Sequence, residues 1–159
     1  MNNFLEKKLE DIGLKKTSSS KIIANYVPCI LSDNLIFVSG QLPIDNGKII
    51  YPGKCDLDLT ENEIKKSVEL ATINMFSNLN ETIISQKKEI SLIKCCNIKG
   101  YLNCSDKFEN HPKTLNYCSD LIIKILGKEL GYHSRTAIGV NSLPLNAPVE
   151  IDGVFSISF

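Results

Sequence analysis

One arginine stands out among the residues of this sequence that could do chemistry. Arg135 is the only arginine of the chain, and apart from two histidines the other basic side chains are lysines. A planar guanidinium binds a carboxylate or phosphate through two parallel hydrogen bonds, whereas a lysine ammonium does not. An arginine at the start of a strand can equally make an exposed ion pair worth about 0–1 kcal/mol. The residue type alone therefore leaves a ligand-binding and a surface interpretation open.

Three further residues could serve a ligand beside such an arginine. Gly40 lies where an apolar strand ends, and a glycine lets a ligand approach backbone N–H groups closely, although the same pattern fits a simple strand end or bulge. Glu150 follows Arg135 across a turn over 143–148, so these two side chains approach each other only if the strand register allows it. On a sheet, Glu150 is more often a solvated residue and Tyr26 more often half-buried packing.

The composition is that of an ordinary globular chain without a charge signature. Its 159 residues include equal numbers of acidic and basic side chains, 18 of each. Nucleic-acid binding is therefore not expected, because it favours a basic stripe on one face. No apolar run reaches the roughly 18–20 residues of a membrane span, and the N-terminus does not resemble a signal or transit peptide. We expect one domain over residues 1–159, a cytoplasmic location, and no charge repulsion against self-association.

The cysteines form no recognisable metal or disulfide pattern. No Cys-x-x-Cys pair occurs, only two histidines exist, and a domain of this length does not need disulfides. No cysteine has sequence neighbours that mark an activated nucleophile. We therefore expect no metal site, and free thiols that are buried or half-buried. The six residues are Cys29, Cys55, Cys95, Cys96, Cys104 and Cys118.

Apolar spacing and capping signals predict two long helices and a short N-terminal one. Thr60 and Glu63 form a capping box, and apolar residues then recur at helical spacing as far as Ile83. Pro112 fits the first turn of a second helix, which a following glycine can end. Residues 1–21 are expected to form an N-terminal extension that is first helical and then a loop.

Strand-like runs flank these helices. Residues 22–41 contain two apolar runs around a Ser-Asp-Asn turn, which predicts a hairpin, and 48–51 predicts a short third strand. Further strands are expected over 92–102, 136–140 and 149–159, the last alternating between apolar and polar residues. The order strands, helix, strand, helix, strands predicts an α+β fold with two helices on one face of a sheet.

Two groups of motifs resemble the RidA family, also called YjgF-type or L-PSP. Near the N-terminus they are Asn-Tyr-Val over 25–27 and Asn-Leu-Ile-Phe-Val-Ser-Gly-Gln-Leu-Pro over 34–43. Near the C-terminus they are Ser-Arg-Thr-Ala-Ile-Gly-Val over 134–140, Leu-Pro over 143–144 and Val-Glu-Ile over 149–151. The spacing within each group matches the family without gaps. The resemblance covers most of the chain and favours the longer branch of the family over the shorter imine deaminases.

This resemblance implies a chorismate-mutase-like fold, with two long helices packed on one face of a mixed sheet, assembled as a homotrimer with clefts between subunits. Arg135 falls on the family's ligand-binding arginine and Glu150 on its acidic partner. Tyr26 falls on the tyrosine that lines the cleft, and Gly40 on the glycine whose backbone meets the ligand. Three further positions are implied to contact substrate, and the second of them replaces the family's cysteine: Ser39, Ala137 and Asn116.

The activity that the resemblance implies is hydrolytic deamination of small 2-imino or 2-enamino acids to 2-oxo acids and ammonia. The expected partners are a small carboxylate metabolite and further copies of the chain, with no cofactor. A non-catalytic protein that senses a carboxylate through the same cleft is the first alternative. The second is an endoribonuclease or translation inhibitor, which the neutral charge does not favour. A trimer that binds through its surface like a chaperone is the third.

Overall fold

A mixed sheet of five strands, in the order β1-β2-β7-β5-β6, organises the structure. The computed structural model describes residues 4–14, 26–86 and 90–159. Its elements are α1 (Phe4–Asp11), β1 (Cys29–Ser32), β2 (Leu35–Gln41), β3 (Ile44–Asp45), β4 (Lys48–Ile49), α2 (Glu61–Ser85), β5 (Leu92–Asn103), α3 (His111–Leu126), α4 (Lys128–Gly131), β6 (Ser134–Val140), η1 (Pro144–Asn146) and β7 (Val149–Ser158).

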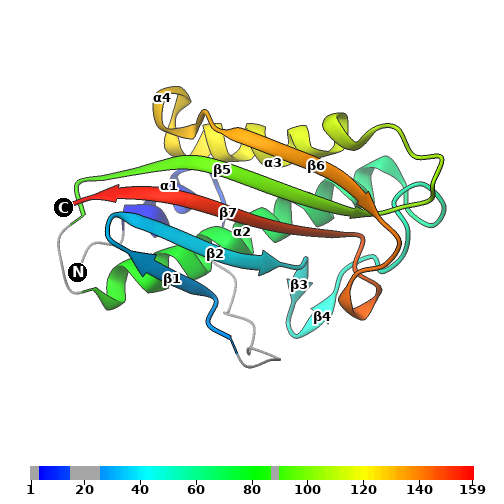
Figure 1. Ribbon diagram of the computed structural model, residues 1–159, viewed down its shortest axis with the longest axis horizontal. Coiled ribbons are helices and arrows are strands. Elements are labelled where there is room, and N and C mark those ends of the chain that lie inside the picture. Colours follow the sequence, from blue (N-terminus) through cyan, green and yellow to red (C-terminus); the bar gives the residue numbers. More distant parts are fainter. Residues whose placement is uncertain (1–3, 15–25, 87–89) are drawn as a thin grey trace.

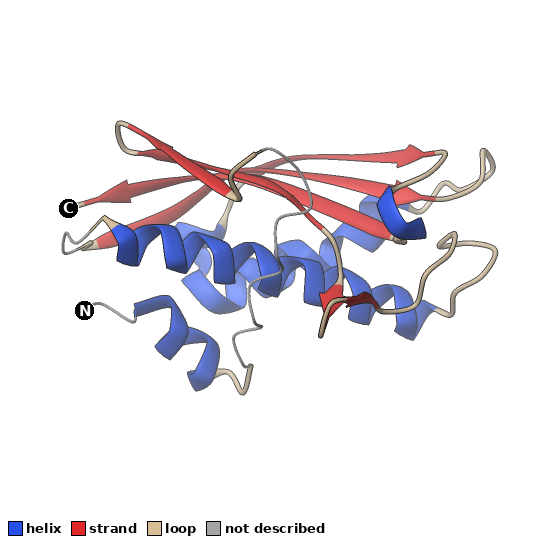
Figure 2. Ribbon diagram, turned by 90° about the horizontal axis from the view of Figure 1, so that it is seen from below, coloured by secondary structure: helices blue, strands red, loops and turns tan. Residues whose placement is uncertain are grey.

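The helices α2 and α3 pack on one face of this sheet, and α1 lies beyond them (Figure 2). On the opposite face, the residues that the structure describes form no long helix (Figure 2). This is the α+β arrangement that the order of elements predicted. None of the helices in the described part of the chain has the length and apolar character of a membrane span.

The strand β5 separates β6 from β7, although β6 and β7 follow each other in the sequence (Figure 1). β5 pairs with β6 in parallel and with β7 antiparallel, and β2 pairs antiparallel with both β7 and β1. The turn before β7 therefore does not close a hairpin. The predicted hairpin near the N-terminus is present as β1 and β2, while residues 22–25 of that prediction lie outside the described residues.

The sequence signals for α2 are confirmed at atomic detail. The backbone N–H of Glu63 donates to Thr60 Oγ1 at 3.4 Å, and the backbone N–H of Thr60 donates to Glu63 Oε2 at 2.8 Å. These two bonds are the reciprocal pair of a capping box, and the helix then continues to Ser85. One face of α2 packs into the core through Val68, Met75 and other fully buried side chains.

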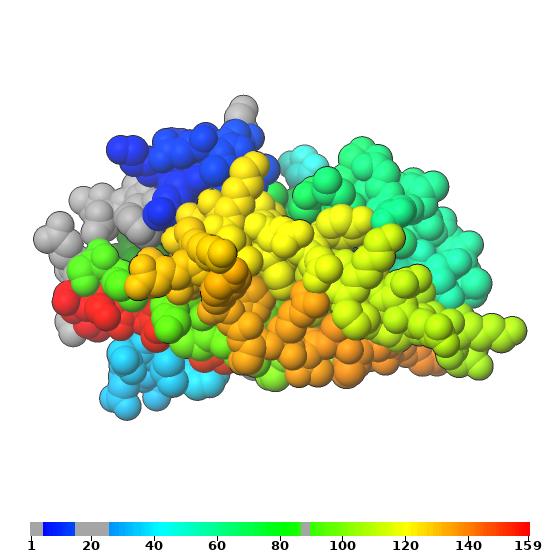
Figure 3. Space-filling view, turned by 90° about the horizontal axis from the view of Figure 1, so that it is seen from above, coloured from blue at the N-terminus to red at the C-terminus, as the bar shows by residue number. Residues whose placement is uncertain are grey.

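The helix α3 begins with Pro112 in its first turn, as predicted, and runs along β6 on one side of the molecule (Figure 3). The short helix α4 that follows was not predicted. Gly131, at its end, lies so close to α3 that a Cβ atom there would be 2.7 Å from the Cα of Ile123. The predicted third strand is shorter than expected, because only β4 pairs, with β3.

The alternation of β7 also appears as predicted. Val149, Ile151 and Phe155 are buried beneath the helices, while Glu150 and Asp152 point to the opposite face of the sheet. We call this opposite side the open face. Five of the six cysteines are buried and Cys96 is partly exposed, all as free thiols.

The capping box gives a direct test of what starts α2. Replacing Thr60 by alanine removes the side-chain acceptor and is expected to lower the free energy of unfolding by about 1 kcal/mol. For a chain of this size the midpoint of thermal unfolding should fall by about 2–4 °C. Thr60→Ser keeps the hydroxyl and serves as the control. Equal midpoints for the alanine variant and the original protein, measured by circular dichroism, would contradict this role.

Candidate functional site

Arg135 lies near the start of β6 and reaches toward α3. Its Nη1 donates to Ser119 Oγ at 2.9 Å, and its Nη2 donates to the carbonyl oxygen of Pro112 at 3.1 Å. Both partners are neutral. The ion pairs in the described part of the chain all use lysine as the cation, so the guanidinium has no carboxylate partner there. Of its five N–H groups, three remain for a ligand, and its charge is not compensated.

Two residues around the guanidinium were not identified from the sequence. Ser119 Oγ lies 3.0 Å from Nε2 of His133, and Nδ1 of His133 lies 2.6 Å from the carbonyl oxygen of Gly131. Ser119 follows Asn116 by three positions, which places both on one helix face, and this spacing is the signal that could have found it. No local pattern marks His133, because its contact with Ser119 depends on how α4 returns the chain to the sheet.

The other implied substrate contacts near Arg135 share its surroundings. Asn116 is exposed and lies between Pro112 and Ser119 on the face of α3 that Arg135 touches. Ala137 follows Arg135 by two positions on β6 and so points to the same side of the sheet. We call these residues, with Ser119 and His133, the arginine group.

Cys118 lies near Arg135, but its thiol cannot take over the role of the family's cysteine, which is Ala137 here. Cys118 lies on α3, and its fully buried side chain is influenced by the charge of Arg135. Burial raises the pKa of the Cys118 thiol to about 12, outweighing the hydrogen bond with Thr72 and the nearby guanidinium, which lower it. The thiol therefore remains protonated at neutral pH and cannot act as a nucleophile.

Glu150 and Gly40 meet on the open face, where β2 and β7 pair. The register of β2 against β7 shifts between Val38 and Gln41, so Gly40 sits in a bulge. A Cβ atom on Gly40 would collide with Oε1 of Glu150, so a larger residue at this position would displace the carboxylate from its present place. Burial raises the pKa of the Glu150 carboxyl, and the charge of Asp152 adds to this effect.

The bulge at Gly40 is held by polar side chains of α2. Asn78 Nδ2 donates to Gln41 Oε1 at 2.8 Å, and Gln41 Nε2 donates to the carbonyl oxygen of Ser39 at 2.9 Å. Asn74 Nδ2 donates to the carbonyl oxygens of Leu42 and Ile44. These bonds come from a helix on the other side of the sheet, so the backbone near Glu150 is fixed by the core.

Ser39 joins the segment of Tyr26 to the same region. Ser39 Oγ donates to the carbonyl oxygen of Val27 at 2.9 Å, and its backbone N–H donates to that of Pro28 at 2.8 Å. Tyr26 itself is 53% exposed, so it is not the packed residue of the ordinary interpretation. We call Glu150, Gly40, Ser39 and Tyr26 the Glu150 group.

The arginine group and the Glu150 group do not meet within one chain. Ile98 of β5 pairs with both Arg135 and Gly153, so Glu150 lies two strands across and three residues along from Arg135. That register separates the two backbones by roughly 14 Å. Arg135 also points toward the helices, whereas Glu150 points to the open face. A ligand that touches both groups must therefore bridge two copies of the chain.

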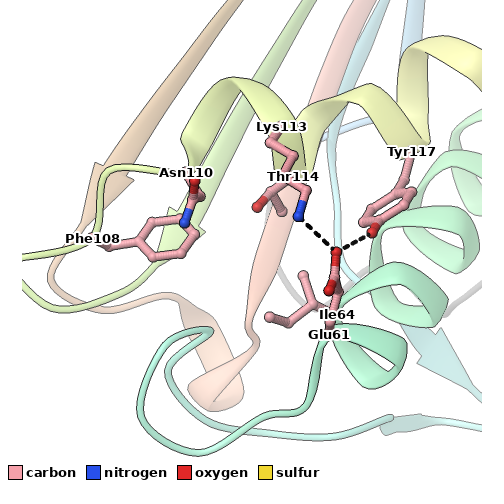
Figure 4. Close-up of a pocket in the computed structure, with 7 residues that line it drawn as sticks. All are labelled: Glu61, Ile64, Phe108, Asn110, Lys113, Thr114 and Tyr117. Atoms are coloured by element: carbon pink, nitrogen blue, oxygen red, sulfur yellow. Dashed lines mark hydrogen bonds and ion pairs between the residues drawn. The ribbon is translucent and has the colours of Figure 1, made fainter.

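A separate pocket of about 180 Å³ lies between α2 and the start of α3 (Figure 4). Glu61 accepts hydrogen bonds from Lys113 Nζ and from the Tyr117 hydroxyl, each at 3.0 Å (Figure 4). The two charged residues of this pocket neutralise each other, so it offers less to an anion than Arg135 does. In the described ranges, no three His, Cys, Asp or Glu side chains cluster to hold a metal ion.

Known proteins resemble this chain along most of its length. The Agrobacterium tumefaciens protein Atu1372 is 32% identical, with a TM-score of 0.84 over 99% of this chain and 96% of its own. Protein TCP17 of Trypanosoma cruzi is 27% identical over 150 residues, which are 94% of this chain and 92% of its own length. The Escherichia coli protein TdcF, solved with bound serine, is 18% identical and shares the fold, with a TM-score of 0.62 over 88% and 94% of the two chains.

A family model matches nearly the whole chain. It covers residues 6–154 and is described as "YjgF/chorismate_mutase-like, putative endoribonuclease". The matched residues include both the arginine group and the Glu150 group. The mixed sheet with two long helices on one face is the fold that the sequence motifs implied. The chain therefore belongs to the YjgF/chorismate mutase-like family.

Proposed function

We propose that this protein binds a small 2-imino or 2-enamino acid and hydrolyses it to a 2-oxo acid and ammonia. The observation that carries the proposal is the half-buried guanidinium of Arg135, which has two neutral partners and no anionic one in the described chain. An Arg fork in this state is suited to a planar carboxylate. The serine bound to TdcF, a distant member of the fold, is also a small molecule with a carboxylate.

The Glu150 group would supply the acid–base chemistry that hydrolysis of an imine requires. Water must add to the imine carbon, and the resulting carbinolamine must lose ammonia. Glu150, whose carboxyl has a raised pKa and lies against Gly40, would orient that water and accept its proton, which is then returned to the departing nitrogen as ammonia leaves. The Tyr26 hydroxyl can assist as a hydrogen-bond donor. These groups would act on a carboxylate held by Arg135 of a neighbouring copy.

The open face gives the reason for several copies to associate, and we propose the homotrimer that the sequence motifs imply. Apolar side chains on this face remain exposed in a single chain: 58% for Ile30, 44% for Phe37 and 44% for Ile138. They come from both edges of the sheet and from its interior. Burying them between copies would be favourable, at roughly 25 cal/mol per Å² of apolar surface. Glu150 and Gly40 lie on the same face, so association would cover the Glu150 group.

Ala137 favours one alternative, a protein that binds a carboxylate without turning it over, because the thiol of the family's cysteine is absent. The arginine group is intact in either case. Ammonia release from freshly generated 2-aminoacrylate separates the two functions, because the binding protein would retain affinity without turnover. The endoribonuclease alternative would be supported by RNA cleavage that survives purification and disappears when a cleft residue such as Arg135 is replaced.

The first variants that test the proposal change Arg135. Arg135→Lys keeps the charge but loses the fork and is expected to lower kcat/KM for 2-aminoacrylate about 100-fold, because hydrogen bonds to a charged group contribute about 1.5–3 kcal/mol. Arg135→Ala should abolish turnover. Lys107→Ala removes an exposed cation instead and is the matched control. Turnover by Arg135→Lys equal to that of the original protein would refute the proposal.

Glu150→Gln is expected to stabilise the protein at neutral pH while lowering its activity. A raised pKa means that folding disfavours the charged carboxylate, so its contribution to stability is full below the ordinary value of 4.5 and is lost as pH rises through the folded pKa. The variant should therefore unfold at a higher temperature than the original protein at pH 8, and the difference should shrink at pH 4.

The matched control for this experiment is Glu109→Gln, which replaces an exposed carboxylate. Thermal unfolding of both variants at the two pH values gives the stability, and ammonia release gives the activity. A lower unfolding temperature for Glu150→Gln at pH 8 would show that the charged carboxylate is stabilised rather than penalised. Unchanged ammonia release would show that Glu150 neither orients the attacking water nor accepts its proton.

A further inference from the structure

Three residues of the arginine group, Arg135, Ser119 and His133, form an unbroken chain of hydrogen bonds that ends on the carbonyl oxygen of Gly131. The guanidinium of Arg135 contacts Ser119 Oγ at 2.9 Å, and Ser119 Oγ contacts Nε2 of His133 at 3.0 Å. Nδ1 of His133 is 2.6 Å from the carbonyl oxygen of Gly131, where the chain ends. The residues come from β6, from the middle of α3 and from the connection after α4.

The two ends of this chain, together with a neutral imidazole, set the direction of each bond in it. A guanidinium can only donate, and a backbone carbonyl oxygen can only accept. Nδ1 of His133 therefore carries a proton, which it donates to Gly131. In a neutral imidazole Nε2 is then an acceptor, so the Ser119 hydroxyl donates its single proton to Nε2. Its lone pairs are left to accept from Nη1 of Arg135.

This direction matters because a hydroxyl rotates freely unless its proton has a fixed acceptor. With its proton donated to Nε2, the oxygen of Ser119 presents a lone pair to the guanidinium. The second anchor, the carbonyl oxygen of Pro112, fixes the rotation of the guanidinium plane. Together the two anchors leave three N–H groups in a constant position for a ligand, which lowers the entropy cost of binding.

The short helix α4 explains why the imidazole stays in place. Gly131 packs against the backbone of α3, with space for no Cβ atom, so its carbonyl oxygen has a defined position relative to Ser119. His133 follows two residues later and is held between this carbonyl and α3. An element that no sequence signal predicted thus orients the last member of the chain.

We propose that His133 and Ser119 are positioning residues for Arg135: the imidazole fixes the serine hydroxyl, and the hydroxyl fixes the guanidinium that binds a small carboxylate. The inference rests on the proposed function only in taking Arg135 as the carboxylate-binding residue. The competing explanation is that the Ser119–His133 bond merely fastens α4 to α3. A fastening bond would change stability, whereas a positioning bond changes affinity through Arg135.

The experiment compares three single variants by their affinity for L-serine, measured by calorimetry. Ser119→Ala removes the hydroxyl, and His133→Asn removes the acceptor, since its shorter amide does not reach Ser119. Each is expected to weaken binding roughly tenfold. His133→Gln places an amide oxygen near the position of Nε2 and should retain affinity within about threefold. Thermal unfolding of each variant measures any purely structural effect.

The double variant Ser119→Ala/His133→Asn tests whether the two residues act as one chain. Because His133 acts through Ser119, the double variant should bind L-serine no more weakly than Ser119→Ala alone. Additive losses would overturn the proposal, because His133 would then act on the ligand by another route. Equal losses for His133→Asn and His133→Gln would also overturn it, since only the first lacks an acceptor.

Arg135→Ala separates failure of this inference from failure of the proposed function. If Arg135→Ala loses L-serine while Ser119→Ala binds it as the original protein does, the positioning role is wrong and the carboxylate site stands. If Arg135→Ala also binds L-serine unchanged, both are wrong. A loss of affinity that only accompanies partial unfolding, in every variant including His133→Gln, would assign the bond to α4 alone.

Discussion

The parallel pairing of β5 with β6 is the constraint on which the rest of the structure depends. A parallel connection must cross over the sheet, and α3 makes that crossing. The crossing lays α3 along β6 and so gives Arg135 its two anchors, Ser119 and Pro112. It also places β6 at the edge of the sheet and inserts β5 between Arg135 and Glu150. The parallel pairing thus both brings the arginine group together and separates it from the Glu150 group.

The separation leaves Arg135 and Glu150 apart, and neither takes part in an ion pair within the described residues. Arg135 is half-buried without an anion in the described chain, and Glu150 is half-buried with a raised pKa. Each side chain would be stabilised by a charge of opposite sign nearby. Within one chain the two side chains cannot supply this to each other, because Arg135 points toward the helices and Glu150 toward the open face. A carboxylate ligand would supply the anion that Arg135 lacks.

Local signals predicted the elements, whereas contacts between distant elements escaped prediction. The capping box of Thr60 and Glu63 and the alternation of β7 depend on neighbouring residues, and both appear as expected. The order of strands is non-local, so the intervening β5 could not be deduced from the turn before Glu150. Ser119 is an ordinary helix residue until α3 is laid on β6. Local chemistry singled out Arg135 as the lone guanidinium and Gly40 as a glycine at a strand end, but only the family motifs implied that both meet a ligand.

The replacement of the family's cysteine by Ala137 narrows the chemistry that the arginine group can perform. The adjacent thiol of Cys118 has a pKa raised to about 12 by burial, so it supplies no thiolate in its place. The polar groups that remain in the arginine group are the amide of Asn116 and the hydroxyl of Ser119 and imidazole of His133, the last two joined by a hydrogen bond. Ser119 already uses its proton and a lone pair within that chain, so it is better placed to hold than to react. In the proposed hydrolysis, proton transfer to and from water would therefore fall to Glu150 and Tyr26, and the arginine group would serve to bind.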